Sequence, residues 1–353
     1  MLPTVALVKF QCVCTSWRDL IRDPRFIKKH HQLASKGNIY LLHKPLQRNG
    51  HRVFRLLFDK TFDQALDIVL PLDLVPMSFT IVGSFNGVLC LADTNSFGTM
   101  IYICNPSIRK YRTINFPIND FTIGSLSNQI DVNIAFGFGY HDETDDYKIV
   151  RILSLPVEED VAKNKVEVYS LTENLWKDVE ADYFPWDLFD ARSDIVVNES
   201  IHWKAIYQDS NEDILVILAF HLVEEVFRQL SVPDYLCDGE DLMEYVGVYK
   251  GNLSLFAFHL ADQDPWDEKC YLWVMREYGV DTSWTKVQSV TISPGVVTPH
   301  TFNQNDEIVY DNGDDESVVY HFDTNTTRVL LGREDQGFLD LVTYMDSLVM
   351  LEG

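Results

Sequence analysis

The sequence lacks the short patterns that usually mark an active site. Its 353 residues contain no C-x-x-C pair, no H-E-x-x-H, no G-x-S-x-G and no phosphate-binding G-x-x-x-x-G-K-[ST] loop. Gly137-Phe138-Gly139 lacks the third glycine and the following helix of a dinucleotide-binding loop. Adjacent residues on a helix point in different directions, so we expect His30 and His31 on a solvated helix face rather than on a shared metal. These absences predict a protein with no catalytic group, no metal and no cofactor of its own.

Long apolar runs are also missing. The longest, from Ile214 to Phe220, is far shorter than the roughly 20 residues that span a bilayer. No N-terminal segment combines a basic start, an apolar run and a small-residue cleavage site, so we expect no secretory signal. The six cysteines have no metal-site spacing and mostly lie in apolar runs, which predicts free, buried thiols in a reducing compartment. The expected location is the cytoplasm, with the nucleus as a second possibility. The cysteines are Cys12, Cys14, Cys90, Cys104, Cys237 and Cys270.

Basic residues are scarce and unevenly placed. The chain has 29 Lys and Arg against 53 Asp and Glu, a net charge of −24. Residues 1–37 hold seven basic and two acidic residues and carry +5, which leaves −29 on the remainder. An acidic body repels phosphate backbones, so we expect no nucleic-acid partner. Such a body attracts basic proteins at long range, and the alternative explanation is solubility alone.

The N-terminal residues predict helices, and the rest of the chain predicts strands. Apolar residues between Leu7 and Ile21 recur every three or four positions, as one face of a helix or tight helix pair requires. Asp23-Pro24 is a cap residue followed by proline, which predicts the start of another short helix. Helical periodicity mostly ends after residue 37. We therefore expect two domains, a helical element at 1–37 and a β body at 38–353.

Short apolar runs separated by turn residues fill the body. Asn86-Gly87 is a strong hairpin signal, and Tyr169 and Trp176 flank a polar turn in a pattern that recurs along the chain. At about 45 to 50 residues per blade, this pattern predicts a mainly β, kelch-type propeller of six or seven blades. A large two-sheet sandwich is the alternative. Strands are expected at 38–43, 53–58, 79–82, 88–91, 100–104, 111–114, 166–171, 175–176, 195–197, 201–203, 214–220, 245–249, 253–258, 271–276, 284–290, 307–310, 318–322, 328–331 and 341–351, the last of them broken near Asp346.

Several segments resemble a known family. The run LPTVALVKFQCVCTSWRDLI at residues 2–21 resembles the second half of a plant F-box. The body resembles the plant F-box-associated interaction domain, most closely that of the S-locus F-box and S-locus F-box-like group. The matching segments, in chain order, are residues 85–90, 104–110, 136–140, 145–150, 166–171, 217–220, 224–227, 272–275, 278–280 and 283–285.

The resemblance implies the substrate-recognition subunit of a Skp1–cullin–F-box E3 ubiquitin ligase, a non-catalytic receptor. In the S-locus group the targets are basic S-RNases of pollen self-incompatibility, which an acidic body fits. The family's F-box begins with a helix before the Leu-Pro pair, whereas Met1 directly precedes Leu2 here. We therefore predict weakened Skp1 binding, and the alternative is an acidic scaffold or decoy that no longer recruits the ligase. A hydrolase-type propeller would need a convergent carboxylate pair that nothing in the sequence marks.

The resemblance and the charge pattern together give two sets of candidate residues. The expected Skp1-docking residues are Leu2, Pro3, Leu7, Val8, Phe10, Val13 and Trp17. The expected target-binding residues are the loop acids Asp142, Glu143, Asp145, Asp146, Glu158, Glu159, Asp160, Asp262, Asp264, Asp267, Glu268, Asp311, Asp314, Asp315 and Glu316. The alternative for Phe10 and Trp17 is the core of the helical element itself. The alternative for the acids is ordinary solvation.

Overall fold

A computed structural model describes most of the chain, and its contacts divide it into two compact units. The first unit is residues 1–115, 303–305 and 330–353, and the second is 116–302 and 306–329. No helix within the described ranges is long and apolar enough to cross a membrane. The described residues are 2, 4–34, 39–43, 53–58, 64–69, 79–93, 100–116, 133–155, 163–179, 186–188, 192–209, 212–233, 242–259, 269–291, 298–303, 305–312, 316–331 and 341–351.

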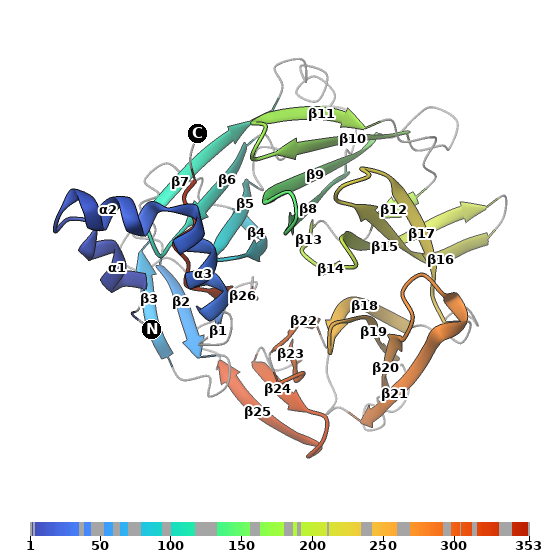
Figure 1. Cartoon of the computed structure of the whole chain (residues 1–353). Helices are drawn as coiled ribbons and strands as arrows, with labels where there is room; N and C mark the ends of the chain where they lie inside the picture. Colours follow the sequence, from blue (N-terminus) through green and yellow to red (C-terminus); the bar gives the residue numbers. More distant parts are fainter. Residues whose placement is uncertain are drawn as a thin grey trace. The chain divides into compact units, whose positions relative to one another are not determined.

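The first unit begins with three helices, as the apolar spacing predicts. They are α1 (Thr4–Phe10), α2 (Thr15–Arg22) and α3 (Pro24–Ala34) (Figure 1). Asp23 caps α3, because its carboxylate accepts hydrogen bonds from the Arg25 backbone N–H at 2.8 Å and from the Arg25 guanidinium at 2.8 and 3.1 Å. These bonds lower the pKa of Asp23 to about 2. We call residues 4–34 the helical tip.

Two four-stranded sheets complete the first unit. In one of them, the C-terminal strand β26 pairs antiparallel with β1, so that Leu41 lies opposite Thr343. In the other, Asn86 and Gly87 join β4 to β5 with φ angles of +52° and +75°, as a two-residue hairpin loop requires. Their shared core includes Phe54, Leu91 and Tyr344. The strands are β1 (Ile39–His43), β2 (Val53–Phe58), β3 (Gln64–Val69) and β26 (Leu341–Met345), and β4 (Phe79–Phe85), β5 (Val88–Asp93), β6 (Met100–Asn105) and β7 (Lys110–Asn115).

Four further sheets of four or five strands belong to the second unit, apart from the last residues of β25. With six sheets in all, the chain is a mainly β, six-bladed β-propeller after a short helical region, which settles the expected six or seven blades at six. The strands are β8 (Asn133–His141), β9 (Asp146–Leu155), β10 (Lys163–Ser170), β11 (Leu175–Val179) and β13 (Arg192–Ser193); β12 (Trp186–Leu188), β14 (Val196–Val197), β15 (Ser200–Asp209), β16 (Glu212–His221) and β17 (Phe227–Ser231); β18 (Leu242–Tyr249), β19 (Asn252–His259), β20 (Lys269–Met275) and β21 (Trp284–Thr291), preceded by a 3₁₀ turn (Asp281–Ser283); and β22 (Thr298–Phe302), β23 (Ile308–Asp311), β24 (Ser317–His321) and β25 (Thr326–Leu331).

Strand β8 is absent from the strands expected from the sequence, and its glycines explain why. Gly137 and Gly139 weaken the strand pattern, since glycine is depleted in strand interiors. A Cβ atom at Gly137 would lie 2.2 Å from Cζ2 of Trp203, a wholly buried residue of β15. The glycine therefore makes room for the largest side chain in the core of its neighbouring sheet.

Two expectations about single residues are wrong. Cys90, Cys104 and Cys270 are buried as expected, but Cys12 and Cys14 are exposed because they lie where the chain turns from α1 into α2. His30 is buried rather than solvated, and its Nε2–H donates to the carbonyl oxygen of Leu2 at 3.4 Å. Among the residues that the structure describes, no group of three or more His, Cys, Asp or Glu could hold a metal ion.

Candidate functional site

The inner face of the helical tip is closed against the body. Leu7 from α1 and Ile21 from α2 are buried with Leu348, a residue that follows β26. Val8, Phe10, Phe26, Ile27 and Ile108 pack around this cluster. Leu7, an expected docking residue, therefore contacts the protein's own chain, and Val8 and Phe10 are half-buried beside it.

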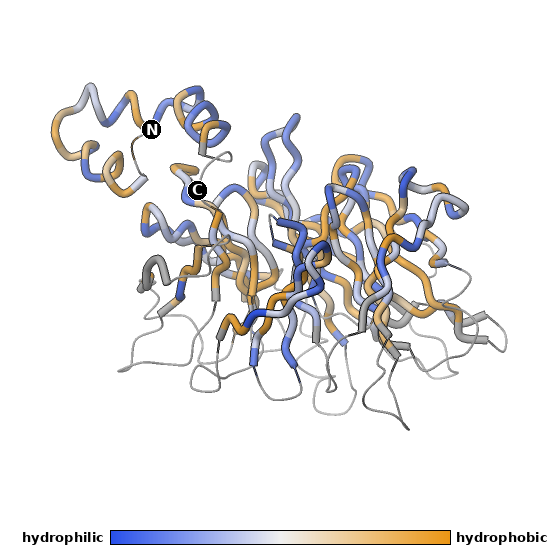
Figure 2. Tube along the Cα trace, turned by 90° about the horizontal axis from the view of Figure 1, so that it is seen from below, coloured by the Kyte–Doolittle hydropathy of each residue, from blue (hydrophilic) through white to orange (hydrophobic). Residues whose placement is uncertain are grey.

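The outer face of the tip is open and apolar. Val13 and Trp17 are 65% and 46% exposed. Leu2, just before the tip, is 52% exposed, and Pro3 lies outside the described residues. The Trp17 ring meets Phe10 edge-to-face, with ring centroids 5.0 Å apart. Figure 2 shows hydrophobic stretches alternating with hydrophilic ones along the tip. Three further exposed apolar residues were not expected from the sequence, namely Val5, Leu20 and Leu33. The tip also exposes the basic residues Lys9, Arg18, Arg22, Arg25, Lys28 and Lys29.

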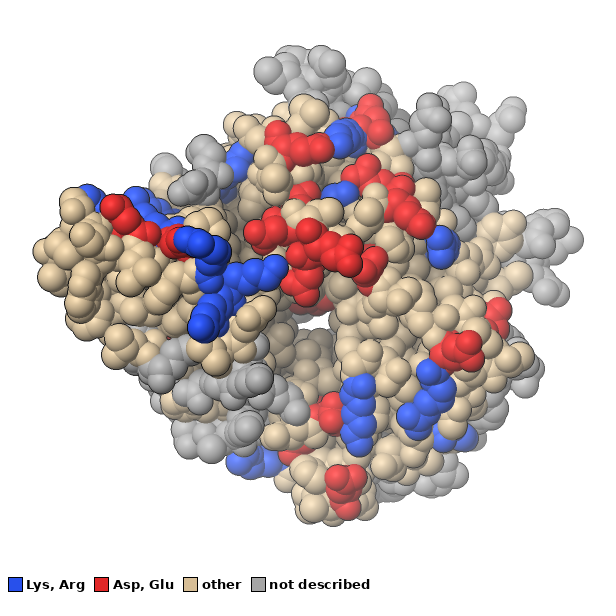
Figure 3. Space-filling view, in the orientation of Figure 1, with Lys and Arg blue, Asp and Glu red and all other residues tan. Residues whose placement is uncertain are grey.

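Acidic residues of the second unit gather at hairpin turns of two sheets. Figure 3 shows Asp and Glu side chains concentrated over the part of the face where β8–β11 and β14 lie. We define the acidic turn surface by the acids of the β8–β9, β10–β11, β14–β15 and β16–β17 turns. They are Asp142, Glu143, Asp145, Glu173, Glu199, Glu224 and Glu225.

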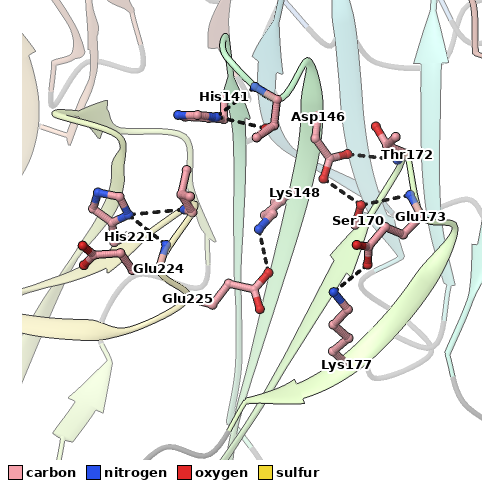
Figure 4. Close-up of polar contacts among 12 residues, drawn as sticks. His141, Asp146, Lys148, Ser170, Thr172, Glu173, Lys177, His221, Glu224 and Glu225 are labelled. Atoms are coloured by element: carbon pink, nitrogen blue, oxygen red, sulfur yellow. Dashed lines mark hydrogen bonds and ion pairs between the residues drawn. The ribbon is translucent and has the colours of Figure 1, made fainter.

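In three of these four turns, the last residue of the preceding strand caps the turn (Figure 4). The Nδ1 atom of His141 accepts the Thr144 backbone N–H at 3.3 Å, and Nδ1 of His221 accepts that of Glu224 at 3.1 Å. The Oγ atom of Ser170 accepts the Glu173 backbone N–H at 3.1 Å. These bonds satisfy backbone groups that the hairpin leaves unpaired, and they hold the acids on rigid loops.

The fourth residue after each cap adopts a left-handed conformation. Asp145, Asn174 and Glu225 have φ angles of +50°, +55° and +54°. A tyrosine one position before the cap fixes this residue in two of the turns, since Tyr140 donates to Asp145 and Tyr169 to Asn174, both at 2.6 Å. Burial, followed by the bond to Asp145, raises the pKa of Tyr140, so its hydroxyl stays a donor.

Ion pairs hold these turns both between the two sheets and within one of them. Lys148 of β9 lies 2.6 Å from Glu225 of the β16–β17 turn and so links the two sheets (Figure 4). Lys177 of β11 lies 2.6 Å from Glu173 in the turn of its own hairpin. Glu199 lies between two histidines, 3.6 Å from Nε2 of His141 and 3.5 Å from Nε2 of His221. Each of these rings uses Nδ1 to accept a backbone N–H, so in the neutral form Nε2 carries the proton and faces Glu199. The geometry suits a carboxylate held by two donors, and it does not suit a metal bound through Nε2.

The expected target-binding acids differ in their exposure to solvent. Asp142, Glu143 and Asp145 are exposed. Asp146 is buried, and its carboxylate accepts bonds from Ser170 Oγ at 2.7 Å and the Thr172 N–H at 2.9 Å, so it joins two hairpins (Figure 4).

The remaining acids lie elsewhere. Asp311 is half-buried, 2.6 Å from Ser317 Oγ and 2.9 Å from His300 Nε2. Glu316 is half-buried beside Asn312, whose Nδ2 donates to it at 3.4 Å. Glu158, Glu159, Asp160, Asp262, Asp264, Asp267, Glu268, Asp314 and Asp315 lie outside the described residues.

The sequence reasoning missed Glu173, Glu199, Glu224 and Glu225, although a repeated pattern marks three of these turns and also the β24–β25 turn, which lies outside the acidic turn surface. An aromatic residue, a cap and a left-handed residue four positions after the cap recur in the same register. The sets are Tyr140, His141 and Asp145; Tyr169, Ser170 and Asn174; Phe220, His221 and Glu225; and Tyr320, His321 and Asn325. The described carboxylates of this surface can bind cationic side chains, and those of Asp145, Glu173, Glu199, Glu224 and Glu225 already contact donors of the protein itself.

Comparison with known protein families gives two matches in chain order. The F-box domain matches residues 1–29. The F-box associated beta propeller domain matches residues 71–351. The first match covers most of the helical tip, and the second covers the turns of the acidic turn surface.

Two similar proteins from Arabidopsis thaliana are F-box proteins by name. F-box protein CPR1 is 28% identical over 305 residues, which covers 82% of this chain and 70% of CPR1. F-box/kelch-repeat protein At3g23880 is 25% identical over 301 residues, which covers 82% of this chain and 76% of that protein. Among solved structures, Porphyromonas gingivalis dipeptidyl peptidase 4 is 8% identical, over 84% of this chain and 44% of that chain. The TM-score of 0.37 is too low for an argument about function.

Proposed function

Because this chain belongs to the family of F-box proteins with an F-box-associated β-propeller domain, we propose that it is a substrate-recognition subunit of a Skp1–cullin–F-box ubiquitin ligase. In this proposal residues 1–37 dock on a Skp1-like adaptor and, through it, on the cullin. Residues 38–353 hold a protein target. Ubiquitin transfer is then the task of the partner subunits, and this chain is a non-catalytic receptor.

The observation that carries this proposal is the open apolar face of the helical tip. Large exposed apolar side chains that cluster on one element usually mark a protein interface, and aromatic anchors dominate the binding energy of such interfaces. Val13 and Trp17 have this character, and the F-box match covers both. The basic residues that the tip exposes fit an acidic adaptor.

For the target, the acidic turn surface supports a basic protein. Asp142, Glu143 and Asp145 would steer such a partner, because complementary charge raises the rate of encounter. A basic S-RNase is the specific candidate, and the sequence resemblance to the S-locus group is what supports it. The expected target-binding acids that lie outside the described residues are proposed for the same role.

The proposal is tested by adaptor binding of the whole chain. We expect the wild type to bind a purified Skp1-like adaptor and Trp17→Ala to bind at least about tenfold more weakly, since an interface aromatic is a common hot spot. Tyr111→Ala is the matched control, because Tyr111 is an exposed aromatic of the same unit that lies outside the tip. Failure of the wild type to bind the adaptor would overturn the ligase proposal and favour the acidic scaffold or decoy.

A further inference from the structure

The six residues after β26 are held by the turn between β6 and β7. Asn105 is wholly buried, and its Nδ2 group donates to the Ser347 carbonyl, the Ser347 hydroxyl and the Val349 carbonyl at 3.2, 3.0 and 2.9 Å. Ser107 Oγ donates to Asp346 Oδ1 at 2.9 Å. We call residues 346–351 the C-terminal segment. One side-chain amide and one hydroxyl thus hold three of its residues, Asp346, Ser347 and Val349.

The β4–β5 turn fits closely against the same segment. Gly87 has a φ angle of +75°, and a Cβ atom there would lie 2.4 Å from the Met345 carbonyl oxygen and 2.7 Å from Cβ of Ser347. Only glycine avoids that overlap and adopts that φ angle without strain. The C-terminal segment is therefore fixed against one sheet of the first unit by backbone fit as well as by hydrogen bonds.

The opposite side of the segment contacts the helical tip. Leu348 is 1% exposed, and it packs with Leu7 of α1 and Ile21 of α2. Ile108, from the same turn that holds the segment, packs against this cluster. Phe26 and Ile27 of α3 also pack against this cluster. All three helices thus meet residues whose positions the segment sets.

We infer that the C-terminal segment supports the helical tip and fixes the orientation of the tip's outer apolar face. The helices have 7, 8 and 11 residues, lengths at which isolated helices are marginal in water. Their order therefore depends on the contact with Leu348. The body's sheets have their own cores and do not need the tip. This inference does not rest on the proposed function.

Hydrogen exchange of the full chain, measured by mass spectrometry, tests whether the C-terminal segment supports the tip. We expect Leu348→Ser to raise exchange of the amides of residues 4–34 roughly tenfold or more, while the amides of β4–β6 keep their protection. Val349→Ser is the matched control, because Val349 is the next apolar residue, its backbone bonds survive the change, and its side chain is not part of the Leu348 cluster. It should leave the tip protected.

A second variant approaches the contact from the tip. Ile21→Ser should raise exchange of the tip and also of residues 345–351, and the double variant with Leu348→Ser should add little to either single change. This variant decides the question if Leu348→Ser unfolds the sheets as well. Wild-type protection of the tip in both single variants, or additive effects in the double variant, would overturn the inference. Adaptor binding plays no part in the measurement, so failure of the proposed function would leave the result intact.

Discussion

The helical tip and the acidic turn surface expose opposite kinds of side chain. The tip exposes large apolar residues such as Val13 and Trp17, while Leu7 and Ile21 on its inner face are buried against Leu348 of the body. The turn surface exposes carboxylates on loops that caps, tyrosine bonds and ion pairs hold in place. Apolar anchors give affinity, whereas exposed charges mainly set the encounter rate and its salt dependence. In the proposed function, the tip is therefore suited to stable docking, and the turns are suited to attracting a basic partner.

The largest effect should come from breaking the scaffold beneath the turns. Arg151 of β9 and Glu167 of β10 form a buried ion pair, with Arg151 Nε 2.6 Å from Glu167 and the guanidinium 3.7 Å from the Phe116 ring centre. Arg151→Met leaves a buried carboxylate with one remaining cation, Lys165, and should lower the free energy of unfolding by about 3–5 kcal/mol. Urea unfolding followed by tryptophan fluorescence measures it.

The control for this prediction is the double variant Arg151→Met/Glu167→Leu. Replacing both partners by apolar residues removes the uncompensated charge, so the double variant should recover most of the loss. Equal stability of the single variant and the wild type would show that the pair does not support the turns.

Acidification should lower the free energy of unfolding of the second unit, by slightly less than the Arg151 substitution does. His202 is buried, contacts the Ile195 carbonyl through Nδ1 at 3.1 Å and accepts the Tyr278 hydroxyl through Nε2 at 2.8 Å. Burial lowers its pKa from 6.5 to about 4. The unfolded chain therefore binds more protons below pH 6.5, and stability should fall by up to about 3 kcal/mol as the pH drops from 6.5 through 4.

Unfolding curves between pH 7 and 4 check this expectation. The His202→Gln variant keeps a polar group at the site without a titrating ring, so its slope against pH should be flatter. Asp23, whose pKa is about 2, stays ionised throughout this range, so the α3 cap should persist while the second unit weakens. A His202→Gln slope equal to that of the wild type would contradict the assignment.

The smallest effect should appear in the turn surface itself. Asp142→Asn/Glu143→Gln/Asp145→Asn removes three exposed charges while nearly preserving shape. The association rate with a basic protein should fall about tenfold at low ionic strength, with the difference fading at high salt. Stopped-flow mixing with a basic ribonuclease measures the rate, and the adaptor affinity of the tip should not change. Equal rates for variant and wild type at low salt would assign these acids to solubility alone.

Patterns of period and turn chemistry in the sequence predict much of this fold. The apolar spacing up to Ile21, the Asp23-Pro24 start and the Asn86-Gly87 hairpin are confirmed. Strand β8 was not predicted because glycines weaken its strand pattern. Gly137 is required there by Trp203, a residue distant in the sequence. Local pattern cannot report a constraint that another sheet imposes.

The site was less predictable for the same reason. An exposed and a buried carboxylate look alike in sequence, so Asp145 and Asp146 received the same role although only Asp145 faces solvent. Leu7 and Val13 share one helical pattern, but Leu7 is buried by Leu348, a partner near the other end of the chain. Burial decided by such distant partners has no local signature.

The pairing of β1 with β26 has a consequence for synthesis of the protein. The first strand of the body to leave the ribosome receives its neighbour only when one of the last has been made. Until then β1 carries an unpaired row of backbone donors and acceptors, which is a template for association with other chains. Any product that ends before residue 341 keeps that edge permanently open, so we expect truncated copies to aggregate or to be degraded rather than to persist as shorter receptors.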